Sequence, residues 1–182
     1  MSALEAVLRR RSHSSVSADA PSTAELLPLV EAAASVADHG SLRPWRLIEL
    51  RGDARDRLGA AFVEASGLEG KDAAKLAAKP LRASLLLAVV AIHRESFKVP
   101  EWEQDASAAG VAHTLSLLLN ESGWGVMWRT GGHTRSEPVQ RMHGLAPNEK
   151  LLGWLYIGGI EKPDKDKGKK KRVDPASVIT RL

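Results

Sequence analysis

Three arginines and a serine follow one another near the N-terminus, at Arg9–Ser12. Guanidinium groups bind phosphate through paired, charge-assisted hydrogen bonds, and the serine hydroxyl would add a further contact. The same arginines would also interact favourably with the negative end of a preceding helix, and that interaction alone would account for their position. The run is therefore a candidate phosphate site, and the helix-ending interpretation stays open beside it.

Two further groups of residues could contact a ligand. His39 stands in the polar, turn-forming run Asp38–Trp45, which could present a histidine and a tryptophan, although a lone loop histidine is more often simply exposed. Trp124 and Trp128 could wall an aromatic ligand, and Arg129 directly follows with another anion-binding group. The competing interpretation is core packing for Trp128 and solvent exposure for Arg129.

Several kinds of chemistry are missing from the sequence. The 182 residues include no cysteine, which excludes disulfides, thiolate catalysis and cysteine-bound metals. There is no P-loop, no Gly-x-Gly-x-x-Gly fingerprint and no Gly-x-Ser-x-Gly elbow. The six histidines include no His-Glu-x-x-His and no obvious ligand pair. We therefore expect no metal site, and we assign no catalytic protein group; His39 is the one candidate acid or base worth testing.

The net charge of +4 comes from one short stretch, Glu161–Arg172, with seven basic and three acidic residues. The rest of the chain holds 19 of each sign and is neutral. Because a nucleic-acid-binding body usually spreads its basic residues over a face, we predict a charged surface loop at 161–172 and no nucleic-acid partner. Binding of a polyanion to this loop is the alternative.

Neither a membrane span nor a secretory signal is predicted. No apolar run approaches the roughly 18 residues that a span requires. The beginning of the chain, Met1–Glu5, has no charged start followed by an apolar region. We therefore expect a cytoplasmic protein with no membrane partner.

Capping signals and hydrophobic spacing predict the elements that would position these residues. Ser2–Glu5, Ser22–Glu25 and Thr134–Glu137 each have the capping-box pattern that begins a helix, and Asp53 could cap another. Pro28 should bend its helix or delay its start. The helices that begin at Ser2, Ser22, Asp53 and Thr134 are predicted to end near Arg9, Asp38–Gly40, Gly67 and Gly144, respectively. Two more helices are predicted over 71–79 and 105–120. Strands are predicted over 45–50, 85–92, 125–128 and 151–158.

The order of these elements predicts an α+β fold in a single domain, residues 1–182. Residues 85–92 are apolar on both faces and should form a central strand. The helix over 105–120 is apolar almost all round and rich in small residues. Such a helix in a chain of this length indicates a subunit interface.

Five motifs in this order resemble the FMN-dependent nitroreductase family, most closely its minimal YdjA-like members. The resemblance covers nearly the whole chain. It implies an α+β nitroreductase-like fold: a small mixed, mostly antiparallel sheet of about four to five strands, surrounded by helices, in a homodimer with two FMN sites at the interface. The motifs are Arg10–Ser12, Asp38–Ser41 with Pro44–Arg46, Lys98–Pro100 with Trp102–Gln104, Trp128–Thr130, and Gly153–Gly158.

The resemblance assigns eight residues to FMN and six to the nicotinamide nucleotide. One subunit would hold the phosphate and ribityl end of FMN, the other subunit would reach the flavin, and a third stretch would also contact the flavin. These three FMN groups are, in that order, Arg10, Arg11 and Ser12; Ser35 and His39; and Trp128, Arg129 and Thr130. The segment matched to the nicotinamide nucleotide is Leu118, Leu119, Asn120, Glu121, Ser122 and Gly123.

Three positions depart from the family pattern. The YdjA-like group tends to have arginine at Ser35 and glutamine at Arg43, and many other members carry lysine at Ser14. These differences bear on cofactor affinity and flavin potential rather than on the fold. The implied activity is ping-pong hydride transfer from NAD(P)H, through FMN, to nitroaromatic, quinone or related acceptors. A non-catalytic flavin-binding or flavin-storage protein of the same fold is the alternative.

Overall fold

The computed structural model describes residues 2–161 and 173–182. Its centre is an antiparallel sheet with the strand order β1-β2-β4-β3, which confirms the four predicted strands. The strands are β1 (Trp45–Leu50), β2 (Leu85–Ile92), β3 (Trp124–Arg129) and β4 (Glu149–Gly159). Apart from Glu161, the predicted charged loop at 161–172 lies outside the described residues.

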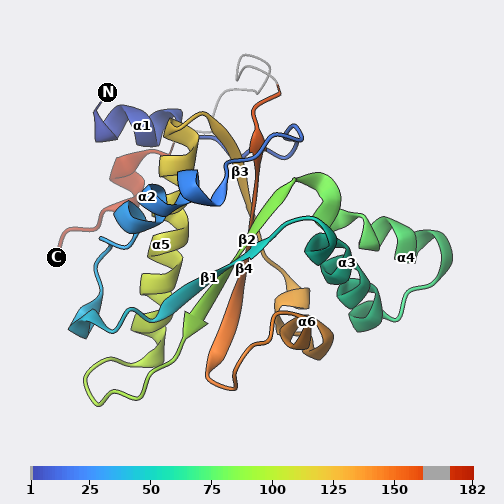
Figure 1. Cartoon of the computed structure of the whole chain (residues 1–182). Coiled ribbons are helices and arrows are strands. Elements are labelled where there is room, and N and C mark those ends of the chain that lie inside the picture. Colours follow the sequence, from blue (N-terminus) through green and yellow to red (C-terminus); the bar gives the residue numbers. More distant parts are fainter. Residues whose placement is uncertain (1, 162–172) are drawn as a thin grey trace.

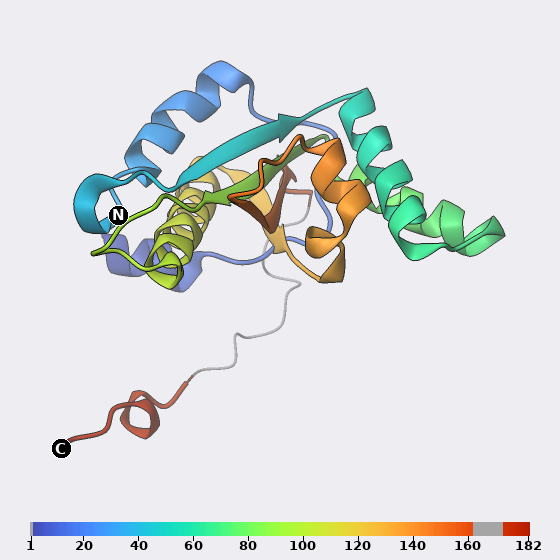
Figure 2. The same ribbon diagram turned by 90° about the horizontal axis from the view of Figure 1, so that it is seen from below.

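Helices form a layer on each side of the sheet, as Figures 1 and 2 show from two directions. One layer is α1 (Ala3–Arg9), α2 (Thr23–Ala33) and α5 (Glu101–Glu121). The other is α3 (Asp53–Ser66), α4 (Gly70–Ala77) and α6 (Glu137–Met142). Alternate residues of β2 enter two separate cores: Leu87 and Val89 pack with α2 and α5, whereas Leu86 and Val90 pack with α3 and α6. The predicted central strand is thereby confirmed.

Side-chain caps explain where two helices begin. Ser2 and Ser22 each accept the backbone N–H of the glutamate three residues later, and both reciprocal bonds are present. Since the second cap fixes the first turn of α2, Pro28 lies inside that helix and does not delay its start. The third predicted box is wrong, because the Thr134 hydroxyl donates to Gly131 O at 2.8 Å and Ser136 precedes α6.

Three other boundaries differ from the prediction. Helix α2 ends at Ala33, five residues before Asp38. Helix α5 begins at Glu101, because Pro100 at its N-cap needs no N–H partner, and not at Asp105. Asp53 is the first residue of α3 rather than its cap. Among the described residues, no helix combines the length and apolar composition that crossing a bilayer requires.

The segment after α1 crosses one end of the sheet. His13 N–H donates to Val126 O and Ser17 N–H donates to Gly159 O, both at 2.9 Å. Beneath this crossing, Gly125 and Gly158 stand opposite each other in the β3–β4 register. A Cβ on Gly158 would lie 2.6 Å from Ser17 O, so the glycine pair leaves the space that the segment occupies.

His143 is a buried histidine whose two ring nitrogens have defined roles. Its Nε2 accepts the indole N–H of Trp154 at 3.0 Å, because an indole can only donate. Its Nδ1 therefore carries the hydrogen and donates to Val139 O at 2.8 Å. Burial lowers the pKa of His143 below its ordinary value of 6.5, and the nearby Arg46 charge acts in the same direction.

This buried histidine should make folding stability depend on pH. As the pH is lowered through about 6.5, the imidazole of His143 is protonated in the unfolded chain but not yet in the folded one. The free energy of unfolding therefore decreases as the pH is lowered, until the pH passes the pKa of the folded state. We expect the loss of melting temperature between about pH 7.5 and about pH 5.5 to be smaller in His143→Gln than in the wild type. Thermal denaturation of both proteins at both pH values measures this decrease in melting temperature. An equal decrease in the variant and the wild type would contradict the role of His143.

Candidate active site

A cavity of 490 Å³ lies on the α3–α6 face of the sheet. Its walls combine aromatic rings with positive charges. They come from α3, β3, β4, η2 (Lys79–Arg82) and η3 (Gly132–Arg135). The lining residues are Phe62, Lys79, Arg82, Met127, Trp128, Arg129, Thr130, His133, Trp154 and Tyr156.

The cations at this cavity are not neutralised by the chain itself. Within residues 2–161 and 173–182, no carboxylate forms an ion pair with Lys79, Arg82 or Arg129. The Arg129 guanidinium lies over the Tyr156 ring, 5.1 Å from its centroid, and its buried Nε has no hydrogen-bond partner. Unpaired cations beside aromatic surface are suited to an anionic aromatic ligand.

Tyr156 adds a neutral hydrogen-bonding group to the same wall. Burial raises the pKa of Tyr156 to about 12, although Arg129 and Arg82 act in the opposite direction. The phenol therefore keeps its proton at neutral pH. It can donate a hydrogen bond without adding a negative charge that would repel an anion.

The crossing segment leads from the arginine run to β3 and β4. It passes from β3 to β4, since the His13 N–H donates to Val126 O whereas the Ser17 N–H donates to Gly159 O. Arg9, four residues before His13, binds Glu121 at the end of α5, so the arginine run begins beside the turn that leads into β3. A 3.4 Å hydrogen bond from an Arg129 nitrogen to Ser14 O, two residues after the Arg10–Ser12 motif, links the segment to the Trp128–Thr130 motif.

The arginine run divides between two tasks. Arg9 forms an ion pair with Glu121 at 2.7 Å, and the Arg10 N–H donates to Ala6 O at the end of α1. The helix-ending interpretation therefore holds for these backbone and Arg9 contacts. The Arg10 and Arg11 guanidinium groups, however, form no ion pair within the described residues, so they remain available to an anion.

Ser35 and His39 lie away from this cavity. His39 Nδ1 is 2.7 Å from Glu103 Oε2, near the start of α5, whereas Arg9 meets Glu121 at its last residue. The helical rise separates these two carboxylates by about 27 Å. The Ser35 hydroxyl, two residues after the end of α2, donates to Ala32 O at 2.8 Å. One chain therefore does not bring His39 to the arginines at the other end of α5.

The segment 118–123 forms the end of α5 and the turn into β3. Leu119 is fully buried in the core, Glu121 binds Arg9, and Gly123 adopts a left-handed φ of 87° after the helix end. These residues thus have structural tasks of their own. Of the sequence-predicted FMN residues, Trp128–Thr130 line the cavity, and Arg10–Ser12 lie on the segment whose Ser14 accepts a hydrogen bond from Arg129. Ser35 and His39 do not join them.

Lys79 and Arg82 are candidate residues that the sequence did not reveal. They flank a short turn between α4 and β2, and that turn matches no motif. Trp128 both packs within the protein and lines a candidate ligand cavity, as the two interpretations of the sequence proposed. Its ring lies edge-on to the His113 ring, with 5.0 Å between the ring centroids.

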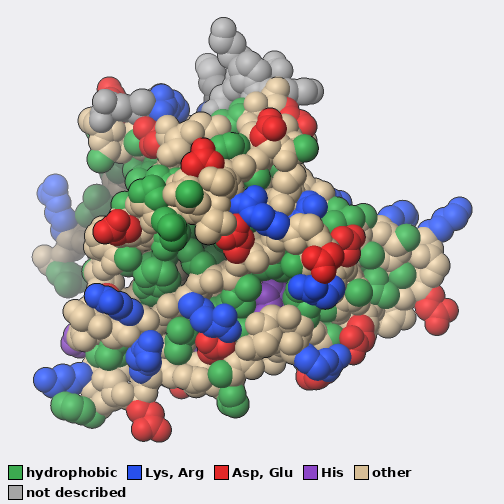
Figure 3. All heavy atoms as spheres, viewed as in Figure 1, with side chains coloured by type: hydrophobic (Ala, Val, Ile, Leu, Met, Phe, Trp, Pro, Cys, Tyr) green, Lys and Arg blue, Asp and Glu red, His purple; other side chains and the backbone are tan. Residues whose placement is uncertain are grey.

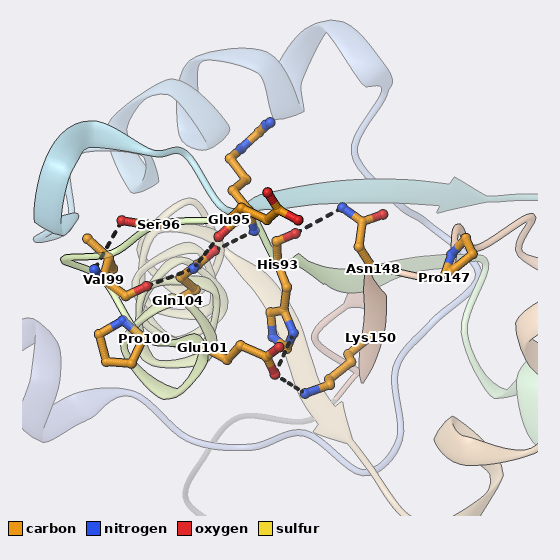
Figure 4. Close-up of a pocket in the computed structure, with 11 residues that line it drawn as sticks. His93, Glu95, Ser96, Val99, Pro100, Glu101, Gln104, Pro147, Asn148 and Lys150 are labelled. Atoms are coloured by element: carbon orange, nitrogen blue, oxygen red, sulfur yellow. Dashed lines mark hydrogen bonds and ion pairs between the residues drawn. The ribbon is translucent and has the colours of Figure 1, made fainter.

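A larger cavity of 720 Å³ surrounds the start of α5 (Figure 4). Several of its charges are paired with one another. Glu101 Oε2 is 3.0 Å from both Lys150 Nζ and His93 Nδ1. The hydrogen bond from Lys150 is the main cause that lowers the pKa of Glu101, and His93 acts in the same direction. Such internal pairing leaves less charge for a ligand than the 490 Å³ cavity offers.

A family model described as "Nitroreductase family" matches residues 7–159. The chain belongs to the nitroreductase family. It is 34% identical over 161 residues to "Putative NAD(P)H nitroreductase YdjA" of Escherichia coli (strain K12), covering 87% of this chain and 88% of that protein. The resemblance seen in the five motifs is thereby confirmed.

Solved structures of nitroreductases share the fold. A nitroreductase-like family protein from Bacillus cereus superposes with a TM-score of 0.86 at 21% identity, over 100% of this chain and 96% of that one. The FMN and NADPH-dependent nitroreductase NfnB from Sphigopyxis sp. strain HMH gives a TM-score of 0.74 at 19% identity, over 100% and 99%. Both likenesses concern the fold.

The glycine pair beneath the crossing segment gives a stability prediction. In Gly158→Ala the new methyl would overlap backbone, so the segment must shift, and we expect a loss of about 1–3 kcal/mol in unfolding free energy. Gly132→Ala is the matched control, since nothing lies within 4 Å of its Cβ position. Urea denaturation compares the two variants, and equal stabilities would show that the crossing is not tight.

Proposed function

We propose that this nitroreductase-family protein is an FMN-dependent NAD(P)H oxidoreductase that reduces nitroaromatic, quinone or related acceptors. The observation that carries the proposal is the set of unpaired cations around an aromatic cavity that the Trp128–Thr130 motif lines. The relatives named as NAD(P)H and as FMN- and NADPH-dependent nitroreductases support it. A cytoplasmic location, with its supply of NAD(P)H, agrees with this activity.

The residues present fit an anionic, aromatic cofactor. Arg10, Arg11 and Ser12 would hold the phosphate through charge-assisted hydrogen bonds. Arg129, with its unpartnered buried Nε, and Lys79 would lie beside the ring system. When bound, FMN supplies the acceptance of a hydride from NAD(P)H and its delivery to the acceptor. The cations of the chain would stabilise the negative charge that develops during reduction.

We further propose a homodimer that completes each site from both chains. His39 and the arginines lie at opposite ends of α5, so a two-fold pair with crossing α5 helices would bring one chain's His39 to the other chain's arginines. Figure 3 shows apolar side chains gathered over α2 and α5. Leu4, Leu27 and Trp102 of this layer are 63–69% exposed, which is typical of a surface covered by a partner.

The spectrum and the turnover of the purified protein test the activity. We expect a yellow protein that oxidises NADPH or NADH when a nitroarene or quinone is present. A protein that stays colourless with excess FMN would end the proposal. Tight FMN binding without NAD(P)H oxidation would instead favour the flavin-storage alternative, which the departures from the family pattern at Ser35 and Arg43 motivate.

Neighbouring arginines provide a matched test of phosphate binding. Arg10→Ala should raise the FMN dissociation constant by about 10- to 100-fold, since hydrogen bonds to charged groups contribute about 1.5–3 kcal/mol. Arg9→Ala should change it little, because Arg9 binds Glu121. Fluorescence titration measures both constants. Equal losses for the two variants would assign the effect to general charge rather than to a phosphate site.

An interface substitution tests the shared site. Leu27→Asp places a carboxylate on the apolar layer and should weaken dimerisation and FMN binding together. Leu68→Asp, at a leucine exposed beside α4, is the control and should do neither. Analytical ultracentrifugation with FMN titration reads both properties. Full FMN affinity in a monomeric Leu27→Asp protein would refute the shared site.

A further inference from the structure

The loop that carries His39 is held in an uncommon backbone conformation. Besides Gly40, the non-glycine residues Ser41 and Arg43 have φ values of 50° and 46°. Such left-handed residues cost conformational energy and persist where surrounding contacts impose them. One such contact is the Asp38 carboxylate, which accepts the Arg43 N–H at 2.7 Å.

A second loop supports the first from beneath. Gln104, fully buried in α5, accepts the Arg94 N–H at 2.9 Å and donates to Arg94 O and Val99 O at 2.9 and 3.1 Å (Figure 4). Val99 lies under Gly40, with its methyl 3.5 Å from the Cβ position of that glycine. The first turns of α5 therefore fix the surface on which the His39 loop rests.

The residue before this anchor binds the histidine ring itself. Glu103 Oε2 lies 2.7 Å from His39 Nδ1. A carboxylate can only accept, so Nδ1 carries the hydrogen and Nε2 of the neutral ring keeps a lone pair. Nε2 forms no hydrogen bond within the described residues, and the side chain is 55% exposed. The ring is thus oriented on one side and open on the other.

We propose that Glu103 is a positioning residue for the flavin site, holding His39 so that Nε2 accepts a hydrogen bond from FMN bound to the partner subunit. This inference rests on the proposed function. It also accounts for two neighbouring motif residues: Gln104 fixes the loops, and Glu103 fixes the ring. Neither task requires Glu103 to touch the cofactor.

FMN titrations of the full-length dimer test the inference. Glu103→Ala should raise the dissociation constant about three- to tenfold, the usual effect of freeing one ordered side chain. Glu103→Gln should restore most of the affinity, because the amide oxygen still accepts from Nδ1. Glu101→Ala is the control: it removes a carboxylate from the same helical turn, but one that binds Lys150, and it should leave the constant unchanged.

A double-mutant comparison separates positioning from a general structural effect. In a His39→Ala background, Glu103→Ala should cause no further loss of affinity, because the two residues act as one unit. An additional loss of the same size, or wild-type affinity in Glu103→Ala alone, would overturn the inference while leaving FMN binding intact. Failure of the wild-type protein to bind FMN would overturn the proposed function itself.

Discussion

The arrangement of this molecule depends on the crossing of the N-terminal segment over the β3–β4 pair. Two backbone hydrogen bonds, from His13 and Ser17, hold the segment there, and Gly125 and Gly158 leave the room for it. These bonds hold the residues that directly follow the arginines against β3 and β4. The segment that follows the candidate phosphate group thus contacts Arg129 through Ser14 O, although more than a hundred residues separate them in the chain.

Helix α5, in contrast, holds His39 and Arg9 far apart, at its two ends. Its 21 residues connect the His39 loop at one end with Arg9 at the other. A stiff helix cannot shorten this distance, so residues at its two ends can serve one ligand only if a second chain contributes. The exposed apolar side chains on the same layer supply a hydrophobic reason for two chains to associate.

Charge pairing distinguishes candidate binding groups from structural ones. Arg9 and Lys150 each meet a carboxylate, and their charges are largely satisfied within the chain. Lys79, Arg82 and Arg129 have no such partner among the described residues, and they surround aromatic rings. An unneutralised cluster of this kind attracts anions, whereas a paired one chiefly joins elements. The smaller cavity is for this reason the stronger candidate.

Local chemistry was readable in the sequence. The sequence predicted the caps at Ser2 and Ser22, the strand β2 that is buried on both faces, and the family motifs. Each of these features depends on residues close together in the chain, so residue spacing was enough to predict it. The tertiary structure alone decided which arginine is paired, that Lys79 and Arg82 line the cavity, and that Glu103 meets His39. Those outcomes depend on contacts between elements distant in sequence, and no local pattern encodes which distant partners meet.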